Sequence, residues 1–364
     1  MTHHMNKQSA LLTTIILTFI VANSSLFCHA QDSVRTFVPI VNYTADLVVN
    51  TRGGIKTGAQ FLGYAEAGVE INPWKNGQFN LTLATTHGDE PSAFLVGDWQ
   101  VFDNIEAGSY FFLNKAWYSH TFNKVTVKVG LQDANDSYST CDASSNMLNT
   151  SFGGNQVLLS AGNIPTMPNN DLGITAEWKV SNTLKWQAGI FNGAYIALGD
   201  GNNFNLKHKL SSSNGYVMVT EAAVNPNDAL LLKLGAFYHT GFENNGYYAS
   251  CEKSFQMQGN RAINAFVTGG YAPRACEDVA NASITCGATL TSLFNRNGAD
   301  AMSAGLATVH IDGYKWETAL ELNYLYQIND HFYASPDLQW IINPGVYLGL
   351  KNALVASLRL GYEL

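Results

Sequence analysis

A stretch near the C-terminus, Trp316–Gly345, alternates between apolar and polar side chains with a period of two. Two runs flank a short Asn329-Asp330 turn, and the polar face of the first run carries Glu317 and Glu321. A period of two indicates β-strands, because successive side chains of a strand point to opposite faces. The runs extend over 11 or 12 residues, whereas strands of soluble proteins usually span about 5–6 residues. Long strands with one apolar face and aromatic ends are typical of transmembrane barrels.

Similar runs occur along the rest of the chain, with no helical segment between them. We expect strands at residues 43–51, 57–71, 78–87, 108–122, 124–132, 171–180, 184–193, 215–225, 229–241, 246–256, 262–270, 287–294, 302–311, 316–327, 332–342 and 354–364. This pattern predicts an all-β fold class, a transmembrane antiparallel up-and-down β-barrel of about 16 strands.

The connections between these strands support a barrel. Those after every second strand are short and rich in Asn, Gly, Asp or Pro, as tight turns require. Most of the others are longer, at 88–107, 133–170, 194–214, 271–286 and 343–353. Short turns on one rim and long loops on the other are expected of an outer-membrane barrel. The longest loop, 133–170, resembles by position the third loop of general porins, which folds into the lumen; an ordinary surface loop is the alternative.

Residues 1–30 have the features of a secretory signal peptide. Lys7 supplies the positive end, Leu11–Ala22 the apolar core, and Cys28–Ala30 the cleavage site. A retained anchor helix and a lipoprotein signal are the alternatives, but the apolar segment is short for an anchor. We therefore expect cleavage after Ala30, which leaves residues 31–364 as the barrel. An exported chain without a membrane helix is either a soluble secreted protein or a closed barrel.

Charged residues inside the predicted strands fall on the face opposite to the aliphatic stripe. A lipid-facing charge costs about 2–4 kcal/mol near the middle of the bilayer, so this face is expected to line a water-filled lumen. The residues of this inner face that we expect to line the solute path are Glu66, Lys128, Lys233, Glu317, Glu321, Tyr333, Asp337, Gln339 and Arg359. A channel for anions would show a basic excess and a cation channel an acidic ring. The mixed charge favours a neutral, hydroxyl-rich solute. The alternative is that these are ordinary polar lumen residues with no preference for a solute.

Other functions find little support in the sequence. The formal net charge of −8 gives no electrostatic basis for nucleic-acid binding. No GxSxG, HExxH, phosphate-binding or dinucleotide-binding motif is present, so we expect neither an enzyme nor a cofactor. Glu317 and Glu321 stand about 13 Å apart along one strand, which is too far for a glycosidase pair.

The predicted mature chain has four cysteines. Cys276 and Cys286 lie in one polar, loop-like segment, so we favour a disulfide between them, with Cys141 and Cys251 as the remaining pair. No cysteine or histidine spacing indicates a metal site.

Several segments resemble carbohydrate-selective porins of the OprB type. The most specific is Pro336–Gly345, preceded by Glu317–Tyr324. Weaker similarities lie at Val96–Asn104, Leu113–Phe122, Val129–Asn135 and Gly189–Gly193. The resemblance spans about residues 40–364 and implies a 16-stranded outer-membrane barrel that passes monosaccharides by diffusion. Members of this family narrow the pore with Arg, Glu and aromatic residues, and by position the candidates here are Glu317, Glu321, Asp337, Gln339 and Arg359.

The sequence thus predicts a bacterial outer-membrane porin for passive diffusion of small carbohydrates. A general porin for small solutes and ions is one alternative, and a secreted β-rich glycan-binding or adhesion protein is another. The expected partners are small sugars as transported solutes and outer-membrane lipid, with no nucleic acid and with the barrel as a monomer or a trimer.

Overall fold

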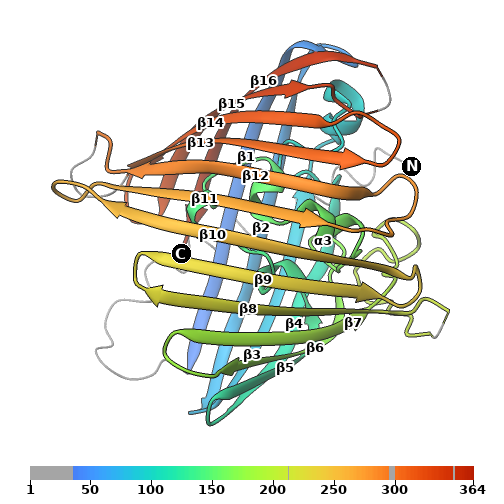
Figure 1. Cartoon of the computed structure of the whole chain (residues 1–364), viewed down its shortest axis with the longest axis vertical. Coiled ribbons are helices and arrows are strands. Elements are labelled where there is room, and N and C mark those ends of the chain that lie inside the picture. Colours follow the sequence, from blue (N-terminus) through green and yellow to red (C-terminus); the bar gives the residue numbers. More distant parts are fainter. Residues whose placement is uncertain (1–35, 212, 295–299, 347–348) are drawn as a thin grey trace.

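A computed structural model describes residues 36–211, 213–294, 300–346 and 349–364 of the chain, and within this part sixteen antiparallel strands close into one barrel (Figure 1). Each strand pairs with its neighbours in sequence, and β1 pairs with β16 to close the ring. The fold class predicted from the sequence is therefore confirmed. The predicted signal peptide, residues 1–30, lies outside the described residues.

The short helices of the described residues lie in the connections between strands. The strands are β1 (Phe37–Gly54), β2 (Gly58–Trp74), β3 (Gly77–His87), β4 (Tyr110–Phe122), β5 (Val125–Gln132), β6 (Asp171–Lys179), β7 (Leu184–Asn192), β8 (Tyr216–Asn227), β9 (Leu230–His239), β10 (Asn244–Gln256), β11 (Ala262–Tyr271), β12 (Ala280–Thr291), β13 (Asp300–Ile311), β14 (Glu317–Gln327), β15 (Phe332–Ile342) and β16 (Lys351–Glu363). The helical turns are η1 (Ser92–Val96), η2 (Ala134–Asp136), η3 (Asp142–Ser144), α2 (Thr150–Gly153) and α3 (Gln156–Ser160). None of the helices in the described ranges is long and apolar enough to cross a membrane.

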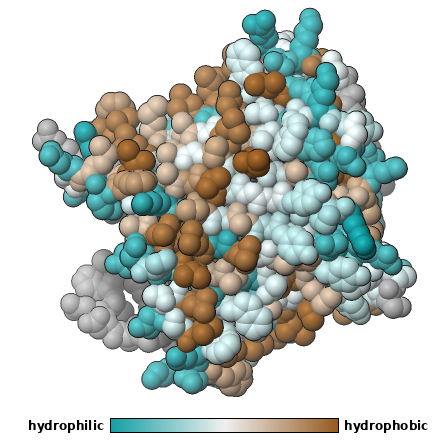
Figure 2. Space-filling view, in the orientation of Figure 1, coloured by the Kyte–Doolittle hydropathy of each residue, from teal (hydrophilic) through white to brown (hydrophobic). Residues whose placement is uncertain are grey.

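Alternation along the strands separates an outer apolar surface from an inner polar one. On β16, Leu358 and Leu360 are exposed, whereas Ser357 and Arg359, which alternate with them, are buried. Parts of other strands, such as β14, alternate in the same way. Figure 2 shows the result on one face of the molecule, where hydrophobic residues gather in a band across the strands between more hydrophilic ends. Such a band matches the apolar belt of a membrane barrel.

The two rims of the barrel differ, as the sequence predicts. One rim, called here the turn rim, holds the short connections such as 123–124 and 228–229. The opposite loop rim holds the three long connections, 88–109, 133–170 and 193–215.

Two strand predictions need correction. β1 begins at Phe37 rather than at residue 43, and β12 covers Ala280–Thr291 rather than 287–294. Apart from Ile284, the first half of β12 consists of small and polar residues, which give a weak alternation signal, and the sequence therefore predicted a loop there.

The correction of β12 also removes the predicted disulfide. Cys286 lies within β12, six residues past its loop-rim end at Ala280, whereas Cys276 lies in the loop before that strand. Cys286 lies about 20 Å along β12 from Ala280, at about 3.3 Å per residue. Cys276 stays at the loop rim, with its Sγ 3.3 Å from Asn244 Oδ1 at the start of β10, and a disulfide requires Cα atoms within about 7 Å. Both residues, like Cys141 and Cys251, are free cysteines, so the predicted Cys276–Cys286 pair is wrong.

All three long loops fold inward and pack against the inner wall. Loop 88–109 places Leu95, Val96 and Phe102 against apolar residues of β1, β2 and β14–β16. Loop 133–170 places Tyr138 and Leu158, with their neighbours, against β7–β10 and β13. Loop 193–215 contributes Leu198 to a smaller cluster on β3 and β4. The hydrophobic cores of this protein therefore lie between loops and wall, inside the barrel.

Candidate functional site

The lumen is the candidate functional site, and its width is set by how the inward loops are held. The nine residues predicted to line it all belong to strands, but the structure gives them two different environments. One group is buried beneath the loops and the other borders open recesses.

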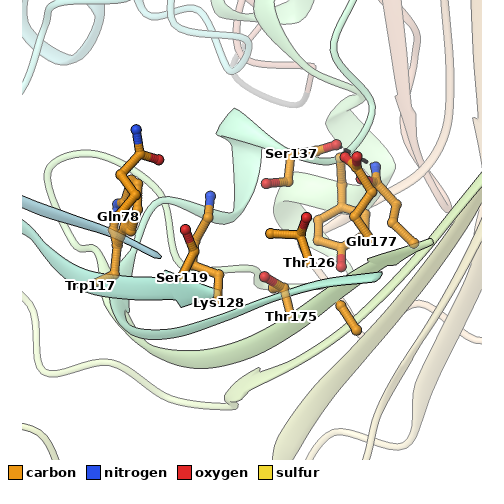
Figure 3. A pocket seen from close by; sticks show the side chains of 11 residues that line it. Gln78, Trp117, Ser119, Thr126, Lys128, Ser137, Thr175 and Glu177 are labelled. Carbon is orange, nitrogen blue, oxygen red and sulfur yellow. Dashed lines mark hydrogen bonds between the residues drawn. The ribbon is translucent and has the colours of Figure 1, made fainter. Parts of the chain in front are cut away.

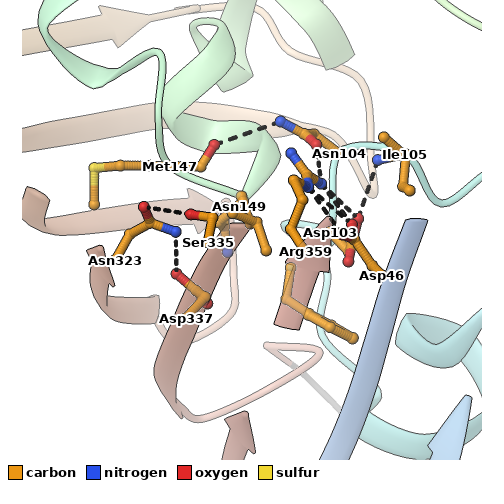
Figure 4. Close-up of polar contacts among 12 residues, drawn as sticks. Asp46, Asp103, Asn104, Ile105, Met147, Asn149, Asn323, Ser335, Asp337 and Arg359 are labelled. Atoms are coloured by element: carbon orange, nitrogen blue, oxygen red, sulfur yellow. Dashed lines mark hydrogen bonds and ion pairs between the residues drawn. The ribbon is translucent and has the colours of Figure 1, made fainter. Parts of the chain in front are cut away.

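Arg359 is in the buried group and joins three parts of the chain (Figure 4). Its guanidinium donates to both carboxylate oxygens of Asp46 on β1, at distances from 2.6 to 3.1 Å. It also reaches loop 88–109, at 3.3 Å from Asp103 Oδ1 and 2.8 Å from Asn104 Oδ1. Because β1 and β16 meet at the closure of the barrel, this ion cluster fastens loop 88–109 to the seam.

Glu317 and Glu321 on β14 hold loop backbones directly. The Glu317 carboxylate accepts hydrogen bonds from the N–H groups of Trp99, Gln100 and Gly345, at 2.8, 2.9 and 2.5 Å. The Glu321 carboxylate accepts from the N–H groups of Leu148 and Asn149, at 2.6 and 3.0 Å. Carboxylates bound to N–H groups make charge-assisted hydrogen bonds, which are stronger than neutral ones. Glu317 thus secures loop 88–109, and Glu321 secures loop 133–170.

Asp337 and Gln339 on β15 continue this network. The Gln339 side chain donates to Phe102 O at 2.8 Å and to Asp337 Oδ1 at 3.1 Å, and accepts from Asn149 Nδ2 at 3.3 Å. Gln339 therefore touches both large loops, while Asp337 orients it. The candidates that the resemblance selected on β14–β16 all lie under the loops, and each is at most 9 % exposed.

Two further anchoring acids were not singled out from the sequence. Glu221 on β8 accepts from Ser139 N at 2.9 Å, and Glu252 on β10 accepts from Ala143 N at 3.0 Å. Lys233 on β9, which was predicted to face the solute, donates to Thr140 O at 2.6 Å and also holds loop 133–170. On the inward face of β8, Glu221 follows the apolar residues Val217 and Val219. A search for polar inward faces therefore does not select Glu221. Those valines are buried under the loop and meet no water.

Two of the remaining predicted residues, Lys128 and Tyr333, border space that the loops leave open. Lys128 on β5 lies in the wall of a recess of about 230 Å³, with its ammonium 4.7 Å from the Trp117 ring centroid (Figure 3). Tyr333 shares a second recess of about 210 Å³ with Arg359 and Glu363. Glu66 on β2 is half-buried and accepts from Asn114 Nδ2 at 2.9 Å.

Loop 88–109 also contains buried acids. The carboxylate of Glu106 accepts from Ser92 N, with both oxygens at 3.1 Å. Burial raises the pKa of Glu106 to about 7. Burial, followed by the neighbouring carboxylate of Glu317, also raises the pKa of Asp98 well above its ordinary range.

These shifts predict a pH-dependent loop. Because the pKa of Glu106 in the folded state exceeds its ordinary value of 4.5, the docked loop favours the protonated acid. The resulting stabilisation is complete below about pH 4.5 and is lost as the pH rises through about 7. We expect loop 88–109 to be cleaved faster by added protease at pH 8 than at pH 5, after correction for the protease's own pH profile. Glu106→Gln should weaken this dependence, with the part due to Asp98 remaining. Glu277→Gln, at an exposed loop site, should keep the full dependence, and an unchanged dependence in Glu106→Gln would contradict the assignment.

Among the residues that the structure describes, no group of three or more His, Cys, Asp or Glu side chains could hold a metal ion. The polar groups of the lumen instead offer hydrogen bonds and paired charges to a solute in the channel.

A closed sixteen-stranded barrel with a polar lumen narrowed by inward loops is the architecture of an outer-membrane porin, a class of channel rather than of enzyme. The sequence profile of the carbohydrate-selective porin, OprB family, matches residues 70–307 and 235–364. The chain therefore belongs to this family, and it is an outer-membrane carbohydrate porin.

Solved structures agree with the fold. The high-pH structure of Pseudomonas putida OprB is similar with a TM-score of 0.80 and 19% sequence identity, over 90% of this chain and 94% of that one. The low-pH structure of the same protein is similar with a TM-score of 0.63 and 16% sequence identity, over 90% of this chain and 93% of that one. A triple mutant of Rhodopseudomonas blastica porin is similar with a TM-score of 0.51 and 14% sequence identity, over 90% of this chain and 100% of that one. No curated protein sequence matches the chain closely enough to count as a relative.

Proposed function

We propose that this porin passes small neutral sugars by passive diffusion, through a path left open between the three inward loops and the wall. The path residues among our candidates are Glu66, Lys128 and Tyr333. The other six candidates act indirectly, because they hold the loops that set the width of the path. These are Lys233, Glu317, Glu321, Asp337, Gln339 and Arg359.

The observation that carries this proposal is the pairing of charges along the lumen. Lys115 Nζ lies 2.6 Å from Asp136 Oδ2, and Lys185 Nζ lies 3.3 Å from Glu177 Oε2. Beneath loop 88–109, Arg359 is likewise paired with the acids Asp46 and Asp103. A selective ion channel needs a ring of one sign, whereas paired charges offer donors and acceptors to hydroxyl groups without a net field. A neutral, hydroxyl-rich solute fits this wall better than an ion of either sign.

Swelling of liposomes that contain the purified porin tests the proposal. We expect small neutral sugars to enter faster than charged solutes of similar size, with rates that fall steeply as the sugars grow. Rates that depend on size alone would identify a general porin and contradict the preference for sugars. Liposomes without protein serve as the control for leakage.

The number of barrels in the assembly, a monomer or a trimer, stays a prediction. Light scattering from the detergent-solubilised protein measures it independently of transport.

A further inference from the structure

We propose that the recess on the inner wall of β3–β7 is a docking site for one neutral sugar ring. This inference rests on the proposed function, because it names the place at which a diffusing sugar pauses. The recess lies between the start of loop 133–170, at Ser137 and Tyr138, and the turn rim of the barrel. Figure 3 shows Trp117 on one side and Glu177 on the other, with Ser119, Lys128 and Thr175 between them.

The first step in the argument is the supply of unused hydrogen-bonding groups. The Lys128 ammonium, the Trp117 N–H and the Ser119 hydroxyl have no hydrogen-bond partner within the described ranges. The Tyr138 hydroxyl also lacks one, although the residue is fully buried. Buried polar groups are normally paired, so these groups are available for new hydrogen bonds, although the Tyr138 hydroxyl lies behind the surface of the recess. On the opposite side, Glu177 and Gln187 supply acceptors.

The second step is the aromatic side chain. Trp117 is the tryptophan that lines the recess, and the Lys128 ammonium lies over its ring at 4.7 Å. This cation–π contact holds the ammonium in place beside the ring, and both groups line the recess. Rings of this kind cover the apolar C–H faces of sugars, while the surrounding donors and acceptors bind the hydroxyl groups.

The third step concerns size and charge. At about 30 Å³ per water, a recess of about 230 Å³ holds roughly seven waters, which is room for a single sugar ring. The charged groups that act most strongly on Lys128 are Asp136, Glu177, Glu70 and Lys115. With Lys185, which pairs with Glu177, the positive and negative groups balance. The charge balance therefore favours a neutral sugar over a sugar acid.

Current through single channels in a planar bilayer provides the test, with glucose as the probe. We expect glucose to reduce the ion current in a saturable way through the intact porin. Trp117→Leu and Lys128→Gln should each raise the half-blocking glucose concentration about tenfold, which corresponds to about 1.4 kcal/mol. Trp178→Leu is the matched control, because this tryptophan lies on β6 but faces outward and is exposed. Heat-modifiable migration on a gel verifies that each variant has folded.

The outcomes separate this inference from the function on which it rests. Blocking that is weakened in both recess variants and unchanged in Trp178→Leu supports the docking site. Equal blocking in all variants overturns it, as does gluconate that blocks more than tenfold better than glucose. If the intact porin swells liposomes in sugars but shows no blocking, the recess proposal fails and the transport proposal stands. If the intact porin does not swell them at all, the transport proposal itself fails.

Discussion

Replacing Glu321 with alanine is expected to widen the channel. Two backbone N–H groups of loop 133–170, at Leu148 and Asn149, lose their carboxylate and remain buried. Hydrogen bonds to a charged group contribute about 1.5–3 kcal/mol each, and a buried donor left unpaired costs a further 1–3 kcal/mol. This loss is large enough to release the segment around Leu148 from β14. We expect a larger and noisier single-channel conductance and faster uptake of sugars that the intact porin excludes by size.

Glu277→Ala is the matched control for this variant, because Glu277 is exposed in the loop between β11 and β12. Its conductance should equal that of the intact porin. Glu321→Gln keeps one acceptor oxygen and should lie between the two. A Glu321→Ala channel with unchanged conductance and an unchanged size limit would show that the carboxylate does not hold the loop.

Replacing Arg359 with methionine is expected to destabilise the whole barrel. The change leaves the carboxylates of Asp46 and Asp103, both fully buried, without their cation. Breaking a buried ion pair from one side costs about 3–5 kcal/mol, because an uncompensated charge stays behind. Since the pair joins β16 to β1, the loss falls at the seam where the barrel closes. We expect a clear drop in the temperature at which heat-modifiable migration on a gel changes.

The control is Arg52→Met, at an exposed site on β1 near the loop rim. The temperature at which the gel migration of this variant changes should equal that of the intact porin. Adding Asp46→Asn and Asp103→Asn to Arg359→Met should recover part of the lost stability, because the uncompensated charges are then removed. If Arg359→Met unfolds at the same temperature as the intact porin, the cluster contributes nothing to closure.

Alternation predicted the inward direction of strand residues wherever the apolar stripe is clear. The candidate Arg359 was assigned from Leu358 and Leu360 on either side of it, and the structure places all three accordingly. The same rule failed where alternation is weak, as in the first half of β12, and that failure produced the wrong disulfide between Cys276 and Cys286. It also missed Glu221, because its inward neighbours Val217 and Val219 are apolar.

The sequence by itself determined the barrel, its two faces and its two unequal rims. These follow from local rules, since a strand repeats every two residues and a tight turn needs particular residue types. Only the tertiary structure decided which inward polar residues meet the solute and which hold a loop. Glu321 and Leu148 are 173 residues apart in the chain, and Arg359 and Asp46 are 313 apart. A side-chain pattern states the direction in which a carboxylate points, but what it meets there depends on distant segments that only folding brings into the lumen.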